Sequence, residues 1–129
     1  MAFRIESSLD GAPPIVETAL MTDSEAGTTG SLVYFSSGKL TLCATTTVPD
    51  GILVKTTLAG TSVSTEFVRL RRDHTVLADY TSTAPVIGSK VYAIDATGLL
   101  VNGGANTGGK IIIKSIDTAK TKCRIGFDL

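Results

Sequence analysis

Tryptophan is absent from this sequence, histidine occurs once, and only 5% of the residues are aromatic. Sugars and single-stranded nucleic acids stack on exposed aromatic rings, so this shortage disfavours a binding module for either ligand. An excess of positive charge is missing too, because 12 Lys and Arg balance 12 Asp and Glu. A nucleic-acid binder needs a basic surface to neutralise phosphates. One histidine also cannot supply the three or four ligands of a zinc site.

Cysteine is scarce, with only Cys43 and Cys123, which lie 80 positions apart. That separation matches neither a C-x-x-C motif nor a zinc-ligand spacing. Cys123 alternates in phase with Ile125 and Phe127, so we expect it to face a core, whereas Cys43 is out of phase with Leu42 and should face the other way. The sequence favours two reduced thiols, as in a protein assembled in a cytoplasm.

Long apolar runs are missing as well. No stretch approaches the roughly 18 apolar residues of a membrane span. Residues 1–6 lack the apolar core of a secretory signal, and the most apolar stretch, residues 110–114, has the length of a strand. We therefore expect neither export nor a membrane partner.

Small hydroxyl side chains are abundant, with 19 Thr and 11 Ser beside 13 Gly. This composition is typical of strands joined by turns. The clearest hairpin covers residues 31–43, with its turn at residues 36–38 and alternating apolar and polar residues in the second arm. Short strands with a turn about every ten residues predict an all-β fold, a small β-barrel or sandwich of short antiparallel strands.

The chain divides at the tandem prolines Pro13 and Pro14. Proline cannot continue a helix and has no backbone N–H to donate to a neighbouring strand. We expect residues 1–14 to form an extended N-terminal arm and residues 15–129 to form a single β-barrel-like domain. The apolar spacing over residues 15–21 fits one face of a helix and a strand equally well, so residues 15–27 remain open between helix and strand.

The second half of the sequence echoes the first. Gly30-Ser31-Leu32-Val33-Tyr34 is followed by Gly38, and Gly88-Ser89-Lys90-Val91-Tyr92 is followed by Gly98. Both stretches read as a glycine, a strand with a Val-Tyr pair, and a glycine turn into a return strand. Either the chain contains an internal repeat, or two unrelated hairpins have turn glycines at the same spacing.

Two features imitate catalytic motifs. Residues 104–110 satisfy the first part of a P-loop, but Ile111 stands where the motif needs a hydroxyl, and the β-branched residues that follow favour a strand over a helix. The sequence has no Gly-x-Ser-x-Gly nucleophile elbow that would present a serine for His74 to activate. We therefore interpret His74 as an exposed loop histidine. The sequence predicts no enzyme, no cofactor and no metal.

Two segments are candidates for partner binding. Arg69, Arg71 and Arg72 form the densest charge cluster, and arginine forks suit bidentate pairing with carboxylates. Arg69 and Arg71 would share a strand face if the strand continues; otherwise the cluster is solvated charge at a strand end. In the arm, Phe3, Arg4 and Ile5 offer anchors that a partner could capture by strand addition.

The spaced glycines and hydrophobic residues resemble a known family. The stretches that carry the resemblance are Gly30-x-x-Val33, Gly38-x-Leu40, Asp50-Gly51-Ile52-Leu53, Pro85 to Tyr92, the turn at Gly98, and Gly108-Gly109-Lys110 with the strands after it. Over residues 16–129 they are similar to the small β-barrel decoration (cement) proteins of tailed-bacteriophage capsids. The arginine cluster at residues 69–72 has no counterpart in that family's pattern.

The resemblance implies a virion structural protein on the capsid exterior, assembled in the host cytoplasm. It would act as a homotrimer that clamps neighbouring subunits of the major capsid protein together. Three alternatives remain: a β-barrel module for carbohydrate, the same for single-stranded nucleic acid, and another virion part such as tail or connector. A surface pair of Tyr34 and Tyr92 would favour a binding module, because it would offer rings for stacking.

Overall fold

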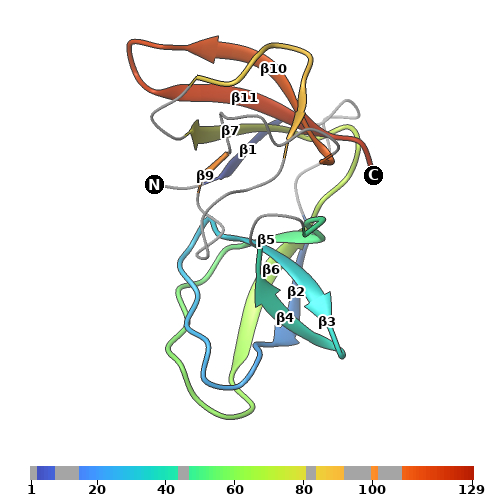
Figure 1. The fold of residues 1–129 in the computed structure, drawn as a ribbon. Coiled ribbons are helices and arrows are strands. Elements are labelled where there is room, and N and C mark those ends of the chain that lie inside the picture. The colour runs from blue at the N-terminus through green and yellow to red at the C-terminus, as the bar shows by residue number, and fades with distance from the viewer. Residues whose placement is uncertain (1–2, 8–14, 44–46, 81–83, 92–99, 102–108) are drawn as a thin grey trace.

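The computed structural model describes residues 3–7, 15–43, 47–80, 84–91, 100–101 and 109–129. This part of the chain contains no helix, and strands take up 51% of these residues, so the predicted all-β class is confirmed (Figure 1). The strands are β1 (Arg4–Ser7), β2 (Val16–Leu20), β3 (Leu32–Ser36), β4 (Lys39–Leu42), β5 (Gly51–Leu53), β6 (Ser64–Arg69), β7 (Thr75–Tyr80), β8 (Lys90–Val91), β9 (Leu100–Val101), β10 (Ile111–Asp117) and β11 (Lys122–Phe127).

The first sheet has the strand order β2-β6-β5-β3-β4, and all its neighbours are antiparallel. Its two edge strands meet at one end, where Met21 forms a parallel bridge with Leu40 and the Thr22 N–H donates to the Leu40 carbonyl over 2.9 Å. The sheet thus curls around its own small core. That core consists of Met21, Val33, Leu40, Leu53 and Phe67.

The predicted hairpin over residues 31–43 is confirmed as β3 and β4. Its two turn residues, Ser37 and Gly38, both have positive φ, at 51° and 80°. Two central residues with positive φ match the right-handed twist of the flanking strands. Residues 16–20, left open between helix and strand, form β2.

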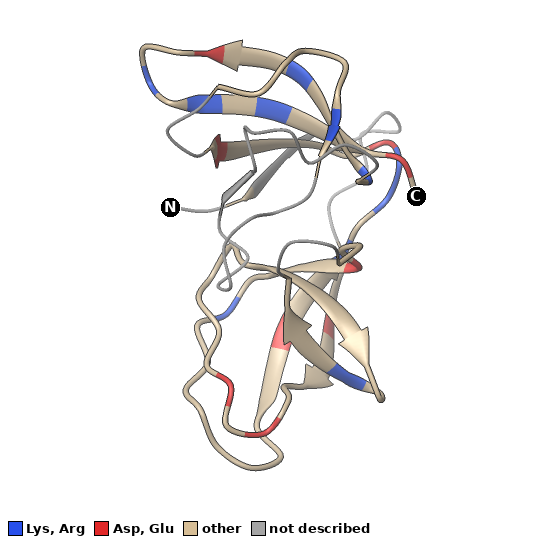
Figure 2. Cartoon of the chain, in the orientation of Figure 1, with Lys and Arg blue, Asp and Glu red and all other residues tan. Residues whose placement is uncertain are grey.

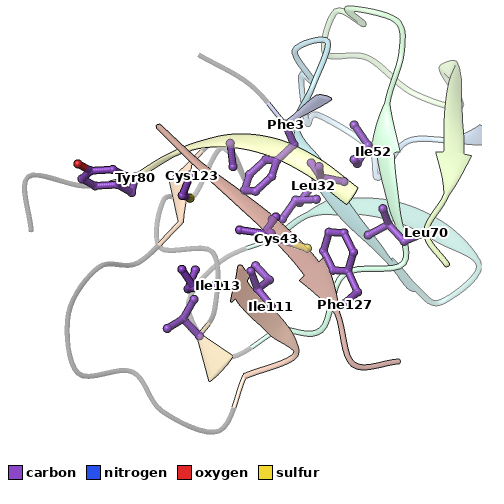
Figure 3. Packing of buried hydrophobic residues seen from close by; sticks show 14 residues of the cluster. Phe3, Leu32, Cys43, Ile52, Leu70, Tyr80, Ile111, Ile113, Cys123 and Phe127 are labelled. Atoms are coloured by element: carbon purple, nitrogen blue, oxygen red, sulfur yellow. The ribbon is translucent and has the colours of Figure 1, made fainter. Parts of the chain in front are cut away.

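The second sheet has the order β1-β7-β11-β10-β8, and the short β9 runs parallel to β7. A larger core lies between the two sheets (Figure 3). Leu32 and Ile52 reach it from the first sheet, while Val76, Ile111 and Ile125 reach it from the second. Successive residues of a strand point to opposite faces, so the first sheet fills both cores at once.

The two halves of the chain share one topology. In the first sheet β2, β6, β5 and β3 are successive neighbours, and in the second sheet β7, β11, β10 and β8 follow in the same relation. Even the parallel contact of β4 with the end of β2 has a counterpart in β9 beside the end of β7. The chain therefore repeats the order of four neighbouring strands and the parallel contact of a fifth.

Matching backbone hydrogen bonds support this repeat. Gly30, with φ 91°, donates to the Leu53 carbonyl, and Gly88, with φ 88°, donates to the Ile113 carbonyl. Each glycine is the third residue of a turn closed by the following serine, whose N–H donates to Thr28 in one half and Val86 in the other. The echo seen in the sequence is thus real at these turns. The second echo's return strand at Gly98 lies outside the described residues.

The start of the chain belongs to the second sheet. Residues 4–7 pair antiparallel with β7, and the Phe3 ring, 2% exposed, lies in the core between the sheets. The boundary expected at residue 14 therefore does not separate Phe3 from the packing of the domain. Residues 8–14 of the expected arm lie outside the described residues. β1 pairs with β7, but among the described residues no strand pairs in the same way with β2, the equivalent of β7 in the first sheet.

Candidate partner-binding surfaces

Arg69, the first residue of the arginine cluster, ends β6 and is bound within its own chain. Its Nε donates to Glu17 Oε2 over 3.0 Å and its Nη2 to Glu17 Oε1 over 3.2 Å. The guanidinium lies 5.4 Å from the ring centroid of Phe35 and 5.5 Å from that of Phe67. Hydrogen bonding with Glu17 raises the pKa of the Arg69 guanidinium. Arg69 thus covers two aromatic rings of the first sheet while half of its side chain stays in solvent.

Arg71 and Arg72 lie in the turn after that strand. Arg71 Nε is 3.1 Å from Asp73 Oδ1, and Arg72 Nε donates to the backbone carbonyl of Leu129. The strand ends at Arg69, so Arg69 and Arg71 do not share a strand face as the continued strand would require. The three guanidinium groups instead contact three separate parts of the same chain.

Phe3, Arg4 and Ile5 were the other expected partner-binding residues. The Phe3 N–H donates to the Gly30 carbonyl over 3.0 Å, and its ring is buried, so it holds the two sheets together rather than offering an exposed anchor. In the backbone register, Arg4 is opposite Leu77 and Ile5 is opposite Val76. The strand addition expected with a partner is made here with the chain's own β7.

His74 was expected to be an exposed loop histidine, and that interpretation is wrong. It is only 2% exposed, and its Nδ1 accepts a hydrogen bond of 3.2 Å from the Arg71 N–H. Its own N–H donates to the Arg71 carbonyl. The imidazole thus closes the turn that leads from β6 into β7, which explains its burial.

Both cysteines are free and buried, and Cys123 faces the core with Ile125 and Phe127 as expected. Cys43 lies in the same core between the sheets, on the face opposite Leu42, which packs toward the smaller core. Burial raises the pKa of the Cys43 thiol to about 12 and that of Cys123 to about 11.

We therefore predict that neither thiol reacts at an appreciable rate with Ellman's reagent in the native protein at pH 8, and that both react after unfolding in guanidinium chloride. An unfolded thiol ionises near 9.0, so above that pH the unfolded state holds fewer protons than the native state. The free energy of unfolding should then fall as the pH rises from about 9 toward 11. Two thiols labelled within minutes in native buffer would contradict this placement.

Within the described ranges, no group of three or more His, Cys, Asp or Glu is placed to hold a metal ion. In the same residues there is no helix long and apolar enough to cross a membrane. Residues 104–108 of the P-loop-like stretch lie outside the described part. Ile111, however, begins β10, so a strand follows Lys110, as the β-branched residues predict.

Two exposed apolar side chains lie together at a turn that the sequence did not mark as a candidate for partner binding. Val86 and Ile87, 72% and 63% exposed, stand at the tip of the turn that precedes β8. The equivalent turn of the first half carries Thr28 and Thr29 there, and the Thr29 hydroxyl bonds that of Thr56 over 3.1 Å. The turn before β8 thus exposes two apolar side chains, whereas the equivalent turn before β3 exposes two polar ones.

A basic face was also missed. Lys114, Lys122 and Arg124 lie on β10 and β11, and Figure 2 shows that several Lys and Arg positions, in blue, fall on these two strands. Lys122 and Arg124 alternate with the buried Cys123 and Ile125, so their period of two was a readable signal. It went unnoticed because the net charge of the whole chain is zero.

Comparison of this chain with protein-family models, curated proteins and solved structures found no match.

Proposed function

We propose that this chain is a capsid decoration protein, a virion structural protein that binds the outer surface of a tailed-phage capsid. It stabilises the shell by bridging neighbouring subunits of the major capsid protein and works without enzymatic activity. The proposal rests on the family resemblance of the sequence. The observation in the structure that supports it is the apolar tip of Val86 and Ile87, two large adjacent side chains that are 72% and 63% exposed in one turn.

A protein with this task needs surfaces rather than reactive groups. Many copies on one shell make modest contacts strong, because neighbouring sites act together. Binding only to the assembled shell also raises the free energy of disassembly. A small domain with two packed cores and an exposed apolar tip offers such a surface on a stable framework.

The alternative of a carbohydrate or single-stranded nucleic-acid module gains no support from Tyr34. Its ring packs partly buried against the core between the sheets, and Tyr92, its expected companion, lies outside the described residues. A tail or connector position remains the nearest rival, since it also asks for binding surfaces.

The tip gives a direct test. Changing Val86 and Ile87 together to serine should weaken co-sedimentation with capsid shells that lack this protein by about tenfold or more, because two apolar side chains no longer leave water on binding. The melting temperature should stay within about 2 °C, since both side chains are solvated in the free protein.

Thr28→Ser, at the equivalent turn of the first half, is the matched control and should bind as the unmodified chain does. Equal shell binding by the double variant and the control would show that the tip is not the docking surface. No binding to shells by the unmodified chain would refute the proposed function itself.

A further inference from the structure

The charge of this chain is divided between its two halves. Residues 15–70 hold three Lys or Arg against five Asp or Glu, whereas residues 71–129 hold eight against five. The first sheet is therefore acidic and the second basic, a division that Figure 2 shows for the described residues. A neutral chain with two oppositely charged ends attracts a second copy of itself end to end.

The repeat sharpens this division to single positions. Glu66 on β6 and Arg124 on β11 are equivalent, because each precedes by one residue the inward Phe67 or Ile125 of its sheet. Asp50 and Lys110 are equivalent as well, since their carbonyls accept from the Leu70 and Asp128 N–H groups over 3.0 and 2.9 Å. At both places the two halves carry opposite charges on the same framework.

Glu66 lies on the face of the first sheet that points away from its small core, here called the outer face, because its neighbours Thr65 and Phe67 point inward. Farther along the same face Val68 and Ile52 are buried, so the outer face is open around Glu66 and covered beyond Val68. It is paired with Thr18 of β2. Around it are apolar side chains that remain exposed: Val16 at 54%, Leu20 at 39% and Val54 at 39%. This face combines a carboxylate with apolar surface that no strand covers among the described residues.

Arg124 lies on the corresponding outer face of the second sheet and is exposed. Lys122 beside it is held by Asp79, with the Nζ 2.8 Å from Oδ1. On the neighbouring β10, Lys114 is exposed and places its Nζ 3.4 Å from the Thr75 hydroxyl. Three cations thus stand on the face that matches, strand for strand, the face around Glu66.

We propose that two copies of this chain associate head to tail, the outer face of β2 and β6 in one copy docking on the outer face of β7, β10 and β11 in the next. Glu66 then lies among Lys114, Lys122 and Arg124, and the apolar residues beside Glu66 leave water. Such a contact uses the acidic face of one copy and the basic face of the other, so each copy keeps its other face free for a further copy. If the rotation closes, the product is a ring.

This inference rests on the proposed function only in the expectation that a decoration protein self-associates. Its test needs no capsid, so a failure here leaves the shell-binding test untouched. The measurement is sedimentation equilibrium of the full chain between 1 and 100 µM, in 20 mM and 500 mM NaCl. Oligomers at low salt that dissociate about tenfold more readily at high salt are the expected result, because salt screens exposed charges.

Charge reversal identifies the faces. Glu66→Lys and Arg124→Glu should each weaken self-association about tenfold or more, because each sets like charges opposite one another. The two changes combined in one chain should restore part of it, because the new lysine then meets the new glutamate while Lys114 and Lys122 still face that lysine. Mixing the two single variants should give a heterodimer, since one intact acidic face still meets one intact basic face.

Lys39→Glu is the control, because it changes the net charge by the same amount as Arg124→Glu but lies on β4, outside both proposed faces. It should associate as the unmodified chain does, and circular dichroism should show all four variants folded. A monomer at every concentration and salt level would overturn the proposal. Association that both reversals leave unchanged would overturn it as well and would point to another face, such as the apolar tip.

Discussion

Replacing Phe3 by alanine is expected to lower the free energy of unfolding by about 3–5 kcal/mol. The Phe3 ring is 2% exposed and packs in the core between the two sheets with residues such as Leu32 and Ile52. Alanine would leave a cavity where both sheets meet, and the surrounding strands are fixed by their ladders and cannot close it. Urea denaturation followed by circular dichroism measures the loss.

Ile15→Ala is the matched control, because Ile15 also lies near the N-terminus but is 77% exposed. Its effect should stay within about 0.5 kcal/mol. Equal and small effects of the two changes would mean that the first residues do not belong to the core. The Phe3 result thus distinguishes the observed packing from the free arm that the prolines at positions 13 and 14 suggest.

Replacing Gly51 by valine is expected to destabilise the protein by about 3 kcal/mol, at the upper end of what overpacking usually costs. A Cβ at this position would lie 2.7 Å from Cδ2 of the Phe67 ring and 3.0 Å from the carbonyl oxygen of Val68. The ring is 1% exposed in the core of the first sheet, and the carbonyl belongs to a neighbouring strand. Neither can move without disturbing that sheet.

Gly126→Val makes the same change on the other half as a control. There the Cβ would meet only the end of the Lys114 side chain, with Cε at 2.6 Å, and this exposed, flexible end can turn away at the loss of its long hydrogen bond to Thr75. The loss should be at least about 1 kcal/mol smaller than at Gly51. Thermal unfolding of both variants measures the difference, and equal losses would show that space around Gly51 is not the constraint.

The all-β class and the first hairpin could be predicted because their signals are local. Alternation with a period of two and the turn at residues 36–38 depend only on neighbouring residues. Residues 15–21 could not be assigned from such signals, because their apolar spacing fits both periods. Only pairing with β6, more than forty residues away, makes them a strand.

The candidate surfaces were harder to predict than the fold. The density of Arg69, Arg71 and Arg72 was visible in the sequence, but their partners Glu17, Asp73 and the Leu129 carbonyl follow from tertiary structure. His74 was misplaced for the same reason, since its burial depends on how the turn packs. Long-range packing decides which polar residues remain available to a partner.

The opposite charges of Glu66 and Arg124 become meaningful only through the repeat. In the sequence they are two isolated residues in a neutral chain, and the echo between Gly30 and Gly88 did not extend to them. The sheet registers place them at equivalent positions. Internal symmetry with reversed charge is what links the fold to a hypothesis about self-association.

The proposed function is tested most directly by counting copies of this protein in particles purified from the source of its gene, by quantitative mass spectrometry against the most abundant shell protein. A decoration protein should be present in hundreds of copies and should be released under mild denaturation while the shell stays intact. A few to tens of copies would place it in the tail or neck instead. Complete absence from the particles would contradict a structural role in the virion.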